Sequence, residues 1–150
     1  MSLKDWKNNG WLRDHKTSAN EIANLFKIVD RDIADGGTSA ISDDWQFGIA
    51  YNAALKLCTI ALYSEGYRPE NTLAHYRTLM SLPMTLGEHH KDDAVYLDAC
   101  RIKRNTVEYD SVSGASHGEA RELLDFVREL RAEVLAFLKK HHPELSPKNL

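Results

Sequence analysis

Apolar residues recur every three or four positions through most of the chain, which is the spacing of one face of a helix. The clearest example lies between Ser42 and Gly66, and it predicts a helix of about six turns with Ser42 as its N-cap. No segment alternates β-branched and polar residues as a strand does. The apolar stripe of this helix consists of Ala50, Ala53, Ala54, Leu57, Ile60 and Ala61.

Two more helices are marked by capping residues. Ser18 and Ser116 are each followed three residues later by a glutamate, which is the signature of a capping box. They predict a helix over residues 19–34 and a last helix that runs from Ser116 to about residue 141.

The remaining helices are predicted between these. Pro69 suits the first turn of a short helix, and Pro83 marks its end. A further helix covers residues 88–109. Its inward stripe is predicted to be Val95, Ala99, Ile102, Thr106 and Tyr109.

The predicted fold class is therefore all-α, an up-and-down bundle of four to five helices with no sheet. One domain spans residues 1–150, with residues 1–17 as an N-terminal extension and 143–150 as a frayed tail. The expected core residues are Leu57, Ile60, Val95, Ile102, Leu123, Val127, Leu130 and Val134.

Composition restricts the function classes. Hydrophobic residues make up 43% and charged residues 27% of the chain, as in ordinary globular proteins. The net charge of −3 argues against a broad basic face but leaves room for a local basic patch. Cys58 and Cys100 lie in predicted helices without CxxC spacing, so we expect buried free thiols in the cytoplasm. No apolar run is long enough to span a membrane.

Metal and cofactor chemistry finds little support in the sequence. His89 and Asp93 are four residues apart, but adjacent His89 and His90 point about 100° apart, and acids are expected in a first helical turn. There is no Glu-x-x-His pair and no glycine-rich phosphate loop. We therefore predict no metal and no cofactor, and interpret His75 as a hydrogen-bonded core residue.

The candidate functional residues lie where the helix over residues 88–109 ends. Three cations, Arg101, Lys103 and Arg104, are followed by Asn105 and Tyr109. An arginine can bind phosphate with two parallel hydrogen bonds, and the amide and phenol add further polar groups. Arg101, Arg104, Asn105 and Tyr109 are therefore the predicted ligand-binding residues.

Two geometric points concern these residues at the end of the helix, which we call the Arg104 corner. Arg104 and Glu108 are four residues apart, so an ion pair within the helix is the alternative role of the arginine. Arg104 and Tyr109 differ by about 140° in direction on an ideal helix. They can meet only if the helix distorts or if a second chain contributes its own copy.

Three features together resemble the HEPN superfamily of small α-helical bundles. They are a long alanine-rich helix ending in Gly66-Tyr67-Arg68-Pro69, a short helix with His75, and the Arg104-Asn105 corner before the last helix. The likeness extends over residues 45–138, although only the corner is a motif.

In HEPN ribonucleases the motif is an arginine followed after four to six residues by a histidine. Here Tyr109 stands where the histidine would be at the shortest spacing, and Asp110 and Ser111 occupy the longer spacings. The family histidine assists cleavage at the ribose 2′-hydroxyl. A tyrosine, with a pKa of about 10, is a poor proton carrier at neutral pH.

The resemblance implies a non-catalytic or weakly active HEPN-like module that binds nucleotide, RNA or a protein partner in a toxin–antitoxin or stress-response setting. The alternative is a metal-independent endoribonuclease that uses Arg104, with Asn105 and Tyr109 as the further catalytic candidates. The resemblance also implies a homodimer and an antitoxin or nucleotidyltransferase-type partner. Trp6 and Trp11, which a small monomer covers poorly, favour a dimer as well.

Overall fold

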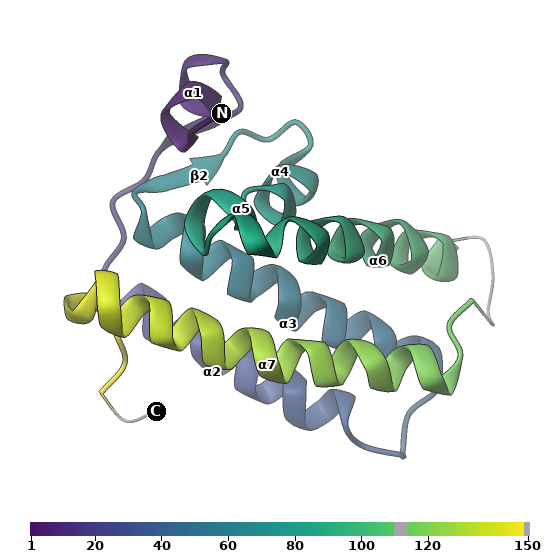
Figure 1. Cartoon of the computed structure of the whole chain (residues 1–150). Helices are drawn as coiled ribbons and strands as arrows, with labels where there is room; N and C mark the ends of the chain where they lie inside the picture. The colour runs from purple at the N-terminus through teal and green to yellow at the C-terminus, as the bar shows by residue number, and fades with distance from the viewer. Residues whose placement is uncertain (110–113, 149–150) are drawn as a thin grey trace.

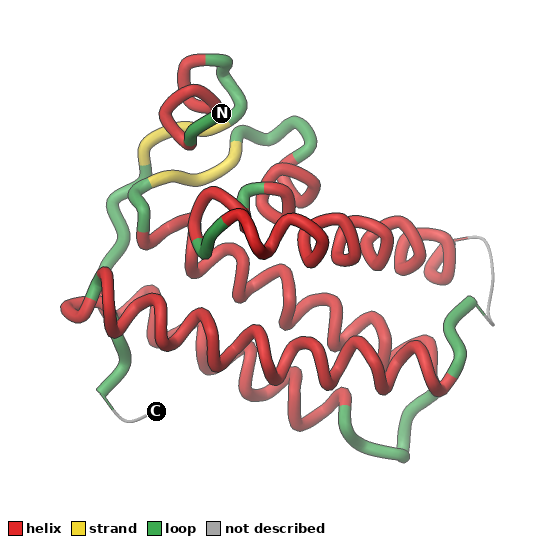
Figure 2. Tube along the Cα trace, viewed as in Figure 1, coloured by secondary structure: helices red, strands yellow, loops and turns green. Residues whose placement is uncertain are grey.

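In the computed structural model, one long helix lies at the centre of a helical bundle (Figure 1). This helix, α3 (Asp43–Ser64), packs against α2 (Ala19–Gly36), α6 (Lys91–Tyr109) and α7 (His117–His141). The structure describes residues 1–109 and 114–148, with the backbone alone over residues 106–109. The chain is mostly helical, as predicted, with small additional elements at the end of the bundle where the N-terminus lies (Figure 2).

The predicted N-caps are confirmed. The hydroxyls of Ser18, Ser42 and Ser116 each accept a hydrogen bond from the backbone N–H three residues later, at 3.1, 3.3 and 3.1 Å. These bonds satisfy N–H groups that a helix start would otherwise leave without a partner. The reciprocal half of the capping box forms at Glu119, whereas the carboxylate of Glu21 accepts a hydrogen bond from Thr17 instead.

The core is formed largely by α3. Its alanine stripe is fully buried, as predicted, and buried residues lie on most of its circumference, as expected for a helix surrounded by others. Six of the expected core residues are buried: Leu57, Ile60, Leu123, Val127, Leu130 and Val134. The two cysteines are free and buried, as predicted.

The register predicted for α6 is wrong. Val95 and Ile102 are each 55% exposed, whereas Ala94, Leu97 and Cys100 are buried. The two possible stripes are related by a rotation of about one residue and contain similar numbers of apolar side chains, so periodicity alone favours neither strongly. The stripe of Ala94, Leu97 and Cys100 is the buried one because it packs against the neighbouring helices. Arg101 and Arg104 continue the same face towards the end of α6.

The prediction of no sheet is also wrong, since a small two-stranded sheet closes one end of the bundle. β1 (Leu12–Asp14) pairs antiparallel with β2 (Tyr67–Pro69), and Leu12 lies opposite Pro69. Strands of three residues are too short to show an alternating pattern in the sequence. Leu12 is buried with Leu3, from α1 (Leu3–Asn8), and with Leu62.

The prolines have roles other than those predicted. Pro69 ends β2, and the next helix, α4 (Ala74–Met80), begins only after Leu73, which has a left-handed φ of 54°. Pro83 lies in the first turn of α5 (Leu82–Thr85), where its missing N–H costs no hydrogen bond. The predicted single helix between the prolines is therefore divided.

Short 3₁₀ segments precede α6 and follow α7. η1 (Glu88–His90) leads directly into α6. η2 (Pro143–Leu145) folds back after α7, and Leu145 packs partly buried against the core. At the other end of the chain, Trp6 and Trp11 pack edge to face with ring centroids 5.7 Å apart. No helix in the described part of the chain is long and apolar enough to cross a membrane.

Candidate functional site

Arg101 and Arg104 lie on the face of α6 that is directed towards α3 and α4. Residues three apart on a helix are neighbours on one face, and both guanidinium groups lie over aromatic rings of other helices. The Cζ of Arg101 is 5.7 Å from the ring centroid of Tyr76 on α4. The Cζ of Arg104 is 5.5 Å from the ring centroid of Tyr51 on α3. These two residues therefore join three helices through cation–π contacts.

Tyr51 is the most deeply buried part of this arrangement. The residue is 2% exposed, and its hydroxyl makes no hydrogen bond with any described residue. Burial raises the pKa of Tyr51 although the charges of Arg101 and Arg104 lower it, so the phenol remains a proton donor at neutral pH. A buried hydroxyl without a partner is uncommon in proteins and is a reason to look for a ligand.

Two residues that the sequence analysis did not place here join the arginines. The charges of Lys56 on α3 and of both arginines act on His75 of α4. Partial burial lowers the pKa of His75 from 6.5, and these three cations lower it further. His75 is therefore neutral at pH 7. We call Lys56, His75, Arg101 and Arg104 the cation cluster.

The interpretation of His75 as a core residue is wrong, since its side chain is exposed. The buried histidine is His90, at 4% exposure, and its Nδ1 lies 2.8 Å from a carboxylate oxygen of Asp93. Among the described residues, no three His, Cys, Asp or Glu side chains are placed to hold a metal ion. Helical spacing alone could not distinguish these two histidines, because each lies near the boundary of an apolar stripe.

The three cations that the sequence places together, Arg101, Lys103 and Arg104, do not all face the same neighbours in the structure. Arg101 also pairs with Asp98 one turn earlier, with Nε 2.7 Å from Oδ1. Lys103 turns away from the cation cluster and forms an ion pair of 2.7 Å with Glu119 on α7. The positive charges of the cluster are therefore those of Lys56, Arg101 and Arg104, and Asp98 lies beside Arg101.

Of the other predicted site residues, Asn105 is exposed on the next position of α6. The side chains of Tyr109 and Glu108 lie outside the described residues, so the roles predicted for both stay predictions. Burial raises the pKa of Cys58 to about 12 and that of Cys100 to about 11, so neither thiol is a nucleophile at neutral pH.

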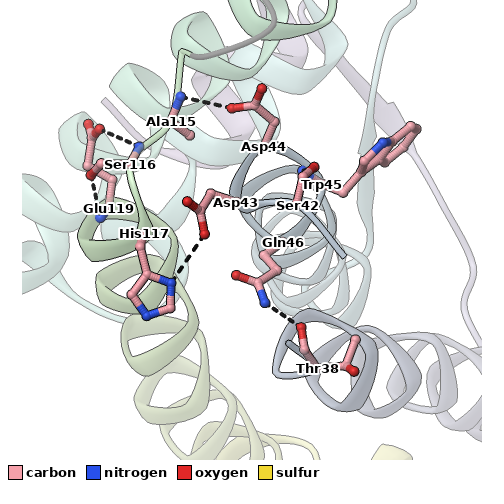
Figure 3. A network of polar contacts seen from close by, with 10 residues as sticks. All are labelled: Thr38, Ser42, Asp43, Asp44, Trp45, Gln46, Ala115, Ser116, His117 and Glu119. Carbon is pink, nitrogen blue, oxygen red and sulfur yellow. Dashed lines mark hydrogen bonds and ion pairs between the residues drawn. The ribbon is translucent and has the colours of Figure 1, made fainter. Parts of the chain in front are cut away.

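A polar network lies where α3 and α7 begin (Figure 3). Asp44 accepts a hydrogen bond of 3.0 Å from the backbone N–H of Ala115, and Asp43 lies 3.2 Å from Nδ1 of His117. The acids at the start of α3 thus hold the start of α7. Trp45 projects away from this network, on the opposite side from the two aspartates (Figure 3).

Comparison with known protein families, with curated proteins and with solved structures finds no significant match. The relationship to the HEPN superfamily thus stays a prediction, and the functional argument rests on the side chains described above.

Proposed function

We propose that this protein binds a phosphate-bearing ligand, RNA or a nucleotide, at the cation cluster and does not cleave it efficiently. The observation that carries the proposal is that Arg101 and Arg104 lie over the rings of Tyr76 and Tyr51, and that their charges and the charge of Lys56, from another helix, all act on His75. The charges of Arg101 and Arg104 both act on the phenol of Tyr51, and positive charge of this kind favours an anion such as a phosphate.

The stacking of the two arginines is compatible with phosphate binding. A tyrosine ring engages the face of a guanidinium group, whereas a phosphate is bound by N–H groups at its edge. A stacked guanidinium is also held in one orientation, so less conformational entropy is lost when the ligand binds. Arg101 and Arg104 are therefore preorganised. The ammonium group of Lys56 adds positive charge without requiring one fixed hydrogen-bond geometry.

The proposal is tested by measuring the affinity for pyrophosphate and for a short single-stranded RNA by calorimetry. Arg104→Gln should weaken both about 10- to 100-fold, because a charged hydrogen bond contributes about 1.5–3 kcal/mol. Lys103→Gln is the matched control, since it removes the same charge from the adjacent position, which faces α7. Equal losses in the two variants would show a diffuse charge effect and contradict the proposed site.

A second candidate function, metal-independent cleavage of RNA, is favoured by His75. A neutral imidazole beside phosphate-binding arginines can accept the proton of a ribose 2′-hydroxyl. The 2′-oxygen would then bond to phosphorus, while the 5′-oxygen leaves with a proton from water, and a 2′,3′-cyclic phosphate forms. Cleavage of RNA in EDTA that is lost in both His75→Gln and Arg104→Gln would establish this function in place of binding.

The wider setting proposed for the protein follows from the HEPN resemblance. It comprises a homodimer, an antitoxin or nucleotidyltransferase-type partner, and a role in a toxin–antitoxin or stress-response system. A dimer would bring two cation clusters into one assembly and raise the local positive potential. Light scattering at micromolar concentration checks the first element, and a mass of one chain would contradict it.

A further inference from the structure

A second apolar stripe lies on α6, and it consists of Val95, Ala99 and Ile102. These residues follow one another at intervals of four and three, so they share one face of the helix. All three are exposed, Val95 and Ile102 at 55% each. Single exposed apolar side chains are ordinary on a protein surface, whereas apolar side chains in a continuous stripe offer a surface that another chain can cover.

The charges beside this stripe let two copies of α6 complement each other when they lie antiparallel. Asp92, near the start of the helix, and Lys103, near its end, lie on the same flank of the stripe, about 60° and 80° around an ideal helix from Val95. A twofold axis between antiparallel helices brings like flanks and opposite ends together. When Val95 faces Ile102 of the second copy, Asp92 and the second copy's Lys103 are about 3 Å apart along the helix axis.

Both charged groups can take part in such a pair. Asp92 is exposed. Lys103 pairs with Glu119 at 2.7 Å, but its side chain is 32% exposed and an ammonium group has three donors, so it can bind a second carboxylate. Asp98, on the other flank, lies 2.7 Å from Nε of Arg101, so its charge is balanced within its own chain.

Ala99 is the middle residue of the stripe. In an antiparallel pair the two copies of Ala99 lie beside the twofold axis, and a side chain this small lets the two helices approach to about 8 Å, the short end of the usual range. In a parallel pair, Asp92 would instead face Asp92 of the second copy and Lys103 would face Lys103, and both contacts would be repulsive. The charges therefore favour the antiparallel pair.

We propose that two copies of this protein associate through the stripe of Val95, Ala99 and Ile102, with their α6 helices antiparallel. This inference rests on the homodimer proposed above and names its contact face. It does not depend on phosphate binding, because the cation cluster lies on the side of α6 towards α3 and α4. One helix face buries less than the roughly 800 Å² per partner of a standard interface, so we expect a dissociation constant in the micromolar range.

Sedimentation equilibrium over the micromolar range measures the association. The wild type should change from the mass of one chain, 17.0 kDa, to twice that mass as its concentration rises. Val95→Glu should weaken the association at least about 100-fold, because each dimer would bury two carboxylates without partners. Ala132→Glu is the matched control, since it places the same charge at an exposed position of α7, and it should associate as the wild type does.

A second variant tests the charges separately from the apolar contact. Asp92→Lys should weaken the association about 2- to 30-fold, because two exposed ion pairs become two repulsive contacts with Lys103. Circular dichroism should show that Asp92→Lys and Val95→Glu unfold at the same temperature as the wild type, since both positions are exposed.

Cysteine cross-linking tests the antiparallel arrangement. Oxidised Ala99→Cys should form a disulfide-linked dimer, because both copies lie beside the twofold axis, whereas Ala132→Cys, also at an exposed alanine, should not. Val95→Cys mixed with Ile102→Cys should cross-link more than either variant alone, because these positions face each other. Cys58 and Cys100 are buried and should take no part.

Failure of this inference is distinguishable from failure of phosphate binding. A wild type that remains one chain throughout the micromolar range overturns the inference, and so does a dimer that Val95→Glu leaves intact. Val95→Cys that cross-links best with itself would show parallel helices and overturn the arrangement.

Pyrophosphate titrated by calorimetry should bind Val95→Glu as it binds the wild type. If Val95→Glu loses that binding, the stripe belongs to the ligand site, which also overturns the inference. If pyrophosphate binds neither protein, phosphate binding is wrong, while the dimer face is still supported by sedimentation and cross-linking.

Discussion

Charged side chains join helices in two regions of this protein, and the kind of contact differs between them. Between α2 and α7, Arg131 makes two hydrogen bonds to Asp30, of 2.6 and 3.2 Å. In the cation cluster between α3, α4 and α6, Arg101 and Arg104 lie over the rings of Tyr76 and Tyr51. The first region contains an ion pair between helices, whereas the second contains cation–π contacts between helices.

The difference separates contacts that hold the fold from contacts suited to a ligand. A matched ion pair recovers part of the cost of desolvating its charges, so its removal weakens the fold. A cation–π contact engages the face of a guanidinium group and contributes about 0.5–1 kcal/mol at an exposed site. The two arginines that make such contacts are the ones on which the proposal of phosphate binding depends.

The largest effect on stability is expected from the core beneath the first region. Leu130→Ala should lower the free energy of unfolding by about 2–5 kcal/mol, because Leu130 is buried and its removal leaves a cavity. Urea denaturation measures the change. Glu129→Ala, at the exposed neighbouring position, is the control and should change stability by less than about 0.5 kcal/mol.

One arginine substitution in each region tests whether the two kinds of contact have different roles. Arg131→Gln should lower the free energy of unfolding by about 1 kcal/mol, because its pair with Asp30 is partly exposed, and should leave RNA affinity unchanged. Arg104→Gln should do the opposite and weaken RNA binding about 10- to 100-fold, with a stability loss below about 1 kcal/mol. If Arg104→Gln unfolds the protein, the cluster is structural and the contrast fails.

Gly48→Ala should raise the free energy of unfolding by about 0.5–1 kcal/mol, because alanine has the better helix propensity and, among the described residues, the new methyl group would only reach ordinary contact with the Nε of Arg104, at 3.9 Å. Thermal unfolding monitored by circular dichroism gives the measurement. A destabilised variant would show that the glycine is needed for packing.

The smallest effect concerns pH. The pKa of His75 is lowered from 6.5 in the folded protein, so its contribution to stability decreases as the pH falls through that value. A bound phosphate favours the protonated imidazole, so affinity should rise several-fold between pH 7 and pH 5.5. His75→Gln should make this rise smaller. Calorimetry at several pH values checks it, and affinity that falls on acidification would contradict the placement of His75 beside the anion.

Local sequence determined the main helices and their beginnings. The N-caps Ser18, Ser42 and Ser116 bond to backbone groups only three residues away, so their effect does not depend on the rest of the fold. The alanine stripe of α3 was equally clear, because it continues over several turns. Chemistry and position along the chain predicted Arg101 and Arg104 as candidate site residues, and their role as ligand-binding residues stays a prediction.

Tertiary structure decided which face of α6 is buried, and with it the composition of the candidate site. Two stripes of similar apolar content compete on that helix, and the free energy that separates them comes from contacts with α3 and α4. Lys56 and His75 join the arginines because helices distant in the sequence pack side by side, which helical spacing cannot reveal. The strands β1 and β2 were missed for the same reason, since each is stabilised by its partner across the sheet and by burial of Leu12.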